Sequence, residues 1–258
     1  MAPSAYFHLL ALVYSVALPL GLLIWWKKKT GARLWCFVVG ALCFLLFAMG
    51  LEQILHSVCL LGDNAFSRAL DASPAAYMLY AAFAAGIFEE TGRLFGFKVL
   101  LRRQRERSCA VAYGIGHGGI EVLLVLGVSY LVYFLAECGI PFGTAEMTET
   151  ILKTADAIPA STVFVAMFER VSAMLAQIGL SMLVFVAARQ KGKRWLYPLA
   201  ILLHAALDAP AALYQAGVIR SITLIEAAAF VTGLVILLLG RKALTGYPEP
   251  AAADEEGA

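Results

Sequence analysis

The chain has 258 residues, of which 61% are hydrophobic and only 15% charged, with a net charge of +2 and a mean hydropathy of +0.80. This composition excludes an ordinary soluble domain, so we expect a lipid bilayer around the chain and no nucleic-acid partner. Seven windows are apolar over roughly the 20 residues that a helix needs to cross a bilayer. They cover residues 5–26, 34–60, 76–101, 109–135, 163–188, 195–217 and 221–240.

Basic residues mark one end of these windows. The stretches "KKKTGAR", "RRQRER", "RQKGKR" and "RK" follow the first, third, fifth and seventh windows, and together hold 14 of the 20 Lys and Arg residues. Loops rich in Lys and Arg stay in the cytoplasm. We therefore predict an all-α, polytopic membrane helix bundle of about seven transmembrane helices, with the N-terminus outside and the C-terminus cytoplasmic. Such a protein would be a multi-pass protein of the plasma (inner) membrane.

The rest of the chain suggests one domain. We predict a transmembrane domain over residues 1–242 and a disordered, acidic cytoplasmic tail over residues 243–258, whose end is rich in Pro, Ala and acidic residues. No basic region precedes the first window, so we expect no cleaved signal peptide. The five cysteines are scattered and lack CxxC spacing, which predicts buried or reduced thiols and neither a disulfide nor a zinc framework.

Ionisable residues inside the apolar windows are the informative exceptions. Each costs about 2.5–3.5 kcal/mol near the bilayer centre on insertion scales, so it usually faces the protein interior and has a function. Three windows carry such residues in short motifs. These are Glu89, Glu90 and Arg93 in "EETGR", His117 and Glu121 in "HGGIE", and His204 and Asp208 in "HAALD".

The three motifs share one depth in the membrane. Counted at ~1.5 Å per residue from the nearest basic cluster, their side chains lie ~14 to ~21 Å along the helices, which predicts one common polar layer. By the same count Glu52 and His56 fall near the outer interface, at ~28 and ~34 Å, and are left out of the site. Glu169 and Arg170 similarly fall near the outer end of the fifth window.

Structural interpretations remain open beside the functional one. "EETGR" could form an internal ion pair, and "HGGIE" and "HAALD" could each clamp two helices together. Gln177 is favoured as an interhelical contact over a hydrogen-bonding partner of the site, and Glu226 as a structural or outer-interface residue. Gly114 and Gly118, four residues apart, predict close packing of a neighbouring helix beside His117.

Two histidines and several carboxylates in a half-dry site suggest an activated water molecule. In one version a zinc ion is bound by ligands drawn from His117, Glu121, His204 and Asp208, and a separate Glu acts as general base. The other version needs no metal, because a Glu takes a proton from water while the histidines orient the water and bind the oxyanion. Arg93 would then keep the second Glu ionised as a structural pair.

The order "EETGR", "HGGIE", "HAALD" on successive helices resembles the YhfC family of intramembrane proteases. That family is itself similar to the larger CAAX-processing and bacteriocin-immunity group of membrane proteases. The resemblance covers about residues 1–240 and implies that six residues form the catalytic site. These are Glu89, Glu90, Arg93, His117, His204 and Asp208.

Two departures from the larger group's pattern matter. Only Thr91 and Gly92 separate Glu90 from the arginine, where that group has three residues, so the choice of base between Glu89 and Glu90 stays open. The last position is Asp208, where an Asn is the alternative, and a carboxylate can bind a metal where an amide would only form hydrogen bonds.

The sequence thus predicts an intramembrane protease that hydrolyses a peptide bond of a membrane-embedded or membrane-associated substrate. We expect its cavity to open toward the cytoplasmic leaflet. A proton-coupled transporter or channel using the same Glu, His and Asp layer is one alternative. A non-catalytic membrane scaffold is the other.

Overall fold

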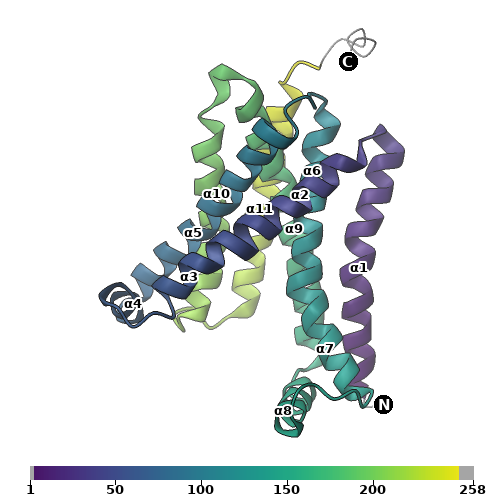
Figure 1. Ribbon diagram of the computed structural model, residues 1–258, viewed down its shortest axis with the longest axis vertical. Helices are drawn as coiled ribbons and strands as arrows, with labels where there is room; N and C mark the ends of the chain where they lie inside the picture. Colours follow the sequence, from purple (N-terminus) through teal and green to yellow (C-terminus); the bar gives the residue numbers. More distant parts are fainter. Residues whose placement is uncertain (1–2, 250–258) are drawn as a thin grey trace.

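The computed structural model describes residues 3–249, and every regular element in that range is a helix (Figure 1). Three of the short segments, η1, η2 and η3, are π-helical turns that continue an α-helix, and η4 is a 3-10 turn. In chain order the elements are α1 (Pro3–Thr30), α2 (Leu34–Leu46), η1 (Phe47–Glu52), α3 (Gln53–Cys59), α4 (Ala65–Asp71), α5 (Pro74–Phe95), η2 (Gly96–Leu100), α6 (Arg107–Val122), η3 (Leu123–Gly127), α7 (Val128–Glu137), α8 (Ala145–Asp156), α9 (Ala160–Arg189), η4 (Lys191–Lys193), α10 (Leu196–Gln215) and α11 (Ile222–Thr245).

Among residues 3–249, six helical stretches are long and apolar enough to cross a membrane, which confirms the all-α, polytopic membrane bundle. The third predicted window corresponds to α5 and η2, which together have the length to span a bilayer but carry four charges, Glu89, Glu90, Arg93 and Lys98. The number seven and the orientation of the termini stay predictions. The six stretches are Ser4–Thr30, Leu34–Cys59, Arg107–Glu137, Ala160–Arg189, Lys191–Gln215 and Ile222–Thr245.

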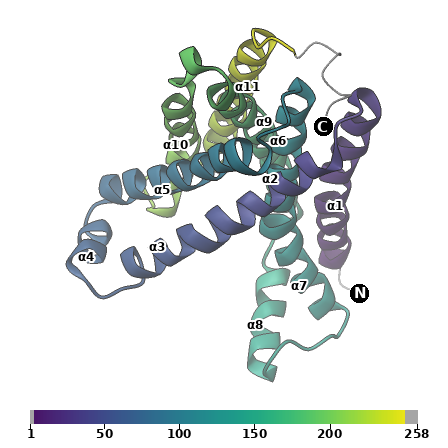
Figure 2. The same ribbon diagram turned by 45° about the horizontal axis from the view of Figure 1, so that its top comes forward.

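Helix α9 lies at the centre of the bundle, since 72% of its most apolar stretch is buried. Helices α6, α10 and α11 pack around it, and α1 lies along the outer side of α6 and α7. The continuous rod formed by α2, η1 and α3 crosses the bundle obliquely, as does α5, and the short α4 joins the two (Figure 2). The three motifs therefore lie on two near-upright helices, α6 and α10, and one inclined helix, α5.

Glycines let the motif helices approach one another closely. A Cβ atom on Gly114 would lie 2.6 Å from the Cα of Ile178, and one on Gly118 would lie 3.0 Å from the Cβ of Gln177. The first distance is too short for a real Cβ and the second is tighter than most real contacts, so the predicted close packing beside His117 is confirmed. Gly86 likewise allows α5 and α10 to pack closely, because a Cβ atom added at this position would lie 2.9 Å from the carbonyl oxygen of Ile201.

The prediction that no cysteine forms a disulfide is wrong. Cys36 on α2 and Cys109 on α6 are joined, with their Cα atoms 5.5 Å apart, although 73 residues separate them in sequence. The pairing follows from the close packing of α2 against α6, which scattered cysteines do not reveal. Cys43, Cys59 and Cys138 are free.

The C-terminal end of the described chain is anchored to the bundle. Helix α11 runs to Thr245, and Tyr247 is buried with its ring centroid 5.3 Å from that of Phe185. The Nε of Arg107 donates to the carbonyl oxygen of Tyr247 at 2.8 Å. Packing thus continues past residue 242, and residues 250–258 of the predicted tail lie outside the described residues.

Candidate functional site

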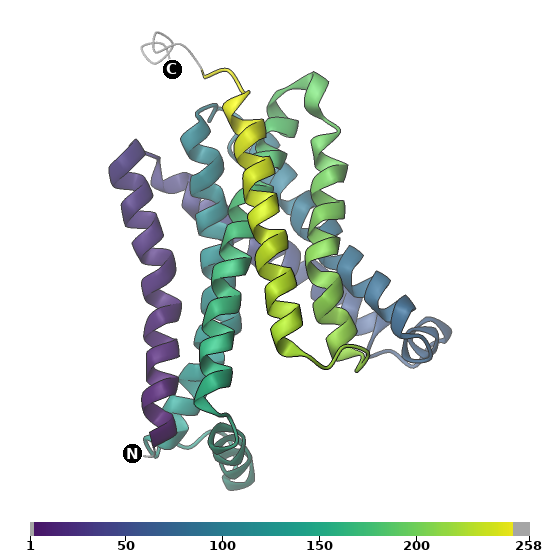
Figure 3. The same cartoon turned by 180° about the vertical axis from the view of Figure 1, so that it is seen from behind.

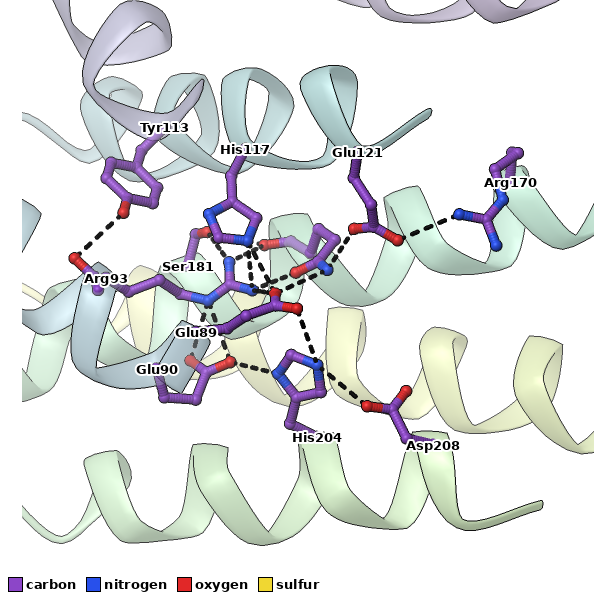
Figure 4. A network of polar contacts seen from close by, with 12 residues as sticks. Glu89, Glu90, Arg93, Tyr113, His117, Glu121, Arg170, Ser181, His204 and Asp208 are labelled. Carbon is purple, nitrogen blue, oxygen red and sulfur yellow. Dashed lines mark hydrogen bonds and ion pairs between the residues drawn. The ribbon is translucent and has the colours of Figure 1, made fainter. Parts of the chain in front are cut away.

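The guanidinium group of Arg93 is the hub of a buried polar network (Figure 4). Its Nε donates to both carboxylate oxygens of Glu90, at 3.0 and 3.1 Å, and one terminal nitrogen donates to Glu89 at 3.2 Å. Spacings of three and four residues place both carboxylates on the arginine's face of α5. From α9, the hydroxyl of Ser181 accepts a hydrogen bond at 3.1 Å, and the side-chain oxygen of Gln177 accepts another. Arg93 has no exposed surface.

Each carboxylate of the pair is also bound to a histidine from another helix. The Nε2 atom of His117 lies 2.9 Å from Glu89, and the Nδ1 atom of His204 lies 2.7 Å from Glu90. The remaining nitrogen of His204, Nε2, lies 3.9 Å from Glu89 and 3.4 Å from Asp208. Glu89 therefore lies between two imidazole rings. Because the Glu90 carboxylate only accepts hydrogen bonds, Nδ1 of His204 carries a hydrogen.

A cavity of about 340 Å³ distinguishes the two glutamates. Glu89, His204 and Asp208 line it, whereas Glu90 has no exposed surface and is not among the lining residues. The side chain of Glu89 is 10% exposed and that of Asp208 is 35% exposed. Of the two carboxylates between which the sequence could not choose, Glu89 is the one that a water molecule or substrate in the cavity can reach.

The cavity extends away from the basic loops. Its lining includes Tyr214 and Gln215 at the end of α10 and Ile222 at the start of α11. In Figure 3 the connection between α10 and α11 lies at the opposite end of the bundle from the C-terminal end of α11, the helix whose last turns include Arg241. The prediction that the cavity opens toward the basic end is therefore wrong, and that the basic end is the cytoplasmic one stays a prediction. Counting residues locates a polar layer in depth, but it does not show at which end the helices part.

A second charged group lies farther along the same cavity. The side-chain nitrogen of Gln177 donates to Glu89 at 3.2 Å and to Glu121 at 2.5 Å, and so bridges the two groups. A terminal nitrogen of Arg170 donates to Glu121 at 3.2 Å, and the other pairs with Glu169. Gln177 is thus both an interhelical contact and a hydrogen-bonding partner of the site. Arg170 and Glu169, set aside by the depth count, line the cavity.

The four candidate zinc ligands are not brought together. Glu121 is held by Gln177 and Arg170, and the Nε2 atom of His117 faces Glu89 with a guanidinium nitrogen of Arg93 only 3.2 Å away. A cation beside that nitrogen would be repelled by the arginine. Within residues 3–249, no three His, Cys, Asp or Glu side chains are arranged to hold a metal ion. This donor set does not fit a zinc centre.

Glu52 belongs to the neighbourhood of the site, although the depth count excluded it. It is 6% exposed, its carboxylate lies 3.1 Å from Nε2 of His56, and Nδ1 of that ring lies 2.8 Å from the hydroxyl of Tyr80. Glu52 is also close enough to Glu89 and Asp208 to interact with them electrostatically. The count failed because α2, η1 and α3 run obliquely, so the distance along the helix exceeds the depth in the bundle. The sequence signal for this pair is the spacing of four residues between Glu52 and His56, which places both side chains on one helix face.

Comparison with known proteins agrees with the motifs. A family model described as "YhfC intramembrane metalloprotease" matches residues 14–229, which include all three motifs. The "Uncharacterized membrane protein YhfC" of Bacillus subtilis (strain 168) is 37% identical over 224 residues, covering 81% of this chain and 84% of that protein. No solved structure matches. The similarity to the CAAX-processing group stays a prediction. The chain is a multi-pass membrane protein and belongs to the YhfC family.

Proposed function

We propose that this protein is an intramembrane protease in which Glu89 is the general base. The observation that carries the proposal is the position of the Glu89 carboxylate, held between His117 and His204 at the wall of a cavity within the bundle. The description of the family as an intramembrane metalloprotease supports the reaction class. The donor arrangement described above favours the metal-independent version of the chemistry.

The attacking water would sit between Glu89 and His204. The Nε2 atom of His204 and a carboxylate oxygen of Glu89 are 3.9 Å apart, a separation that one water molecule can bridge with hydrogen bonds to both. Glu89 takes a proton as the water oxygen bonds to the substrate carbonyl carbon, and then gives that proton to the leaving amine as the C–N bond breaks. His204, when its ring carries both protons, and Asp208, when protonated, can donate to the oxyanion.

Glu90 and Arg93 act as positioning residues in this mechanism. Glu90 binds Nδ1 of His204 and so fixes which ring nitrogen faces the cavity, as carboxylates commonly do for functional histidines. Arg93 contacts both glutamates, so their separation is set by one rigid guanidinium group. Neither side chain needs to touch the substrate.

The packing beyond the site supports hydrolysis over conduction. Between Arg93 and the basic end lies hydrophobic core, where Phe97 packs on Tyr113 with ring centroids 4.5 Å apart and on Phe185 with ring centroids 5.3 Å apart. A transporter or channel would need its polar path to continue through this region. A cavity that ends at Glu89 and His204 is suited to a reaction at its closed end.

Exchange of Glu89 for Gln tests the proposal. The full-length protein, purified in detergent, is incubated with solubilised membrane proteins from cells that lack it, and new N-termini are identified by mass spectrometry. We expect the wild type to generate new N-termini at a rate that Glu89→Gln lowers at least ~10²-fold, because the general base is lost. Glu149→Gln serves as the matched control, since Glu149 on α8 has a 64% exposed side chain and should leave the rate unchanged. Equal cleavage by wild type and Glu89→Gln would overturn the proposal.

A further inference from the structure

Buried polar atoms without a hydrogen-bond partner gather at the cavity. Among residues 3–249, five such side-chain atoms occur, and three of them belong to residues that line this one cavity: Nε of Arg170, Oγ of Ser172 and an oxygen of Glu226. A buried polar group left without a partner costs about 1–3 kcal/mol, and most such groups find one. Three together at one cavity mark a wall whose hydrogen bonds a molecule in the cavity, whether water or ligand, can complete.

These three residues form a wall at the end of the cavity away from the Arg93 network. Arg170 and Ser172 lie on α9, with Arg170 beyond Glu121 in Figure 4, and Glu226 lies on α11. The side chain of Arg170 is 6% exposed and Ser172 is 1% exposed, so both are positioned by packing. Glu226 is close enough to Arg170 and Glu169 to interact with both electrostatically. Nothing in the Glu89 chemistry uses this wall.

The wall offers hydrogen-bond donors, and the carboxyl groups around it outnumber the basic side chains. The Nε–H of Arg170 and the hydroxyl of Ser172 can donate to carbonyl oxygens, whereas the free oxygen of Glu226 can only accept while it is ionised. Glu121 and Glu169 already pair with Arg170, so Glu226 has no guanidinium of its own. In a site of low dielectric an unpaired carboxylate attracts a cation strongly. Five carboxyl groups line the cavity, and only one arginine and one histidine line it with them. The five belong to Glu89, Glu121, Glu169, Asp208 and Glu226.

We propose that this wall is a binding subsite for a basic residue of the peptide substrate. The ammonium or guanidinium group of a Lys or Arg pairs with Glu226, and Arg170 and Ser172 bind carbonyl oxygens of the same peptide segment. The cavity joins this wall to Glu89 and His204, so the basic residue would lie close to the bond that is cleaved. The inference rests on the proposed protease function for its biological meaning, but binding can be measured without cleavage.

Two small probes test the subsite, and they differ only in the presence of a terminal ammonium group. N-acetyl-lysine N-methylamide and N-acetyl-norleucine N-methylamide share their backbone carbonyls and chain length, but only the first carries an ammonium group. Isothermal titration of the detergent-purified full chain should show the lysine probe binding at least ~10-fold more tightly than the norleucine probe, equivalent to ~1.4 kcal/mol. In Glu226→Gln this ratio should fall to about one. In Ser172→Ala both probes should weaken alike, with the ratio kept.

The controls separate this inference from the proteolysis. Glu149→Gln removes an exposed carboxylate on α8 and should keep the lysine preference, and Glu226→Asp, which keeps the charge, should keep most of it. Equal binding of both probes by the wild type, or an undiminished preference in folded Glu226→Gln, would overturn the subsite. A lysine preference in a protein that cleaves nothing would refute only the protease. Cleavage without a lysine preference would refute only the subsite.

Discussion

Two buried arginines, Arg93 and Arg170, sit at opposite ends of one polar network, and they differ in how completely they are satisfied. Arg93 has no exposed surface, and all of its guanidinium nitrogens have partners. Arg170 has a side chain that is 6% exposed, and its Nε has no hydrogen-bond partner. Arg93 balances two carboxylates of its own helix, whereas Arg170 balances one of its own helix and one from α6. From this difference we infer that the Arg93 end of the network (its closed end) holds the helices together. The Arg170 end (its open end) is arranged to receive a ligand.

Replacement of Arg93 should have the largest effect on stability. Arg93→Met leaves the carboxylates of Glu89 and Glu90 buried without their counter-ion, and breaking a buried pair in this way costs about 3–5 kcal/mol. We expect the free energy of unfolding, measured by SDS titration of the purified protein, to fall by that amount. The triple variant that also carries Glu89→Gln and Glu90→Gln should regain most of it, because the uncompensated charges are then gone. Wild-type stability of Arg93→Met would contradict the role of this arginine.

Replacement of Gln177 should have an intermediate effect, because Gln177 links the two ends. Gln177→Leu keeps the approximate volume but removes the donor to Glu89 and Glu121 and the acceptor for Arg93. Loss of partners for buried polar groups predicts a decrease of about 1–3 kcal/mol in the same unfolding measurement. Gln177→Glu is the informative companion, since it keeps an acceptor for Arg93 but loses the donor. If Gln177→Leu were as stable as wild type, the two ends would be independent.

Replacement of Arg170 should lower the free energy of unfolding least. Arg170→Met removes the pairs with Glu121 and Glu169, but the cavity beside them lets water solvate the freed carboxylates. We expect the free energy of unfolding to fall by about 1–2 kcal/mol, less than for Arg93→Met. Binding of both amide probes should weaken in the same variant, because it loses the N–H groups of Arg170 that donate hydrogen bonds to the carbonyl oxygens of the probes. A loss of stability as large as that of Arg93→Met would mean that the open end is structural as well.

Much of the fold and the core of the site could be predicted from the sequence. Long apolar windows specify membrane helices because a bilayer leaves the backbone few alternatives. Charges are rare inside such windows, so "EETGR", "HGGIE" and "HAALD" were conspicuous. Their common depth correctly predicted that Glu89, His117 and His204 would meet.

What could not be predicted depends on how the helices lean and pack. Ser181 is one of several small polar residues on its helix, and only packing shows that it accepts from Arg93. Glu52 was excluded because the depth count assumes an upright helix. The link between Cys36 and Cys109 and the direction of the cavity likewise depend on contacts between helices, which local sequence does not encode.

The π-helical turns make the surroundings of the site tolerant of changes in length. Each wide turn accommodates one residue more than an α-helix would. One follows Arg93 within three residues, and another follows Glu121 within two. Deleting a residue from η3 would convert the wide turn into an ordinary α-helical turn, so that α7 keeps its facing and His117 and Glu121 stay where they are. Insertions and deletions among relatives can therefore accumulate at these turns, and an alignment that allows gaps there would keep the motifs in register.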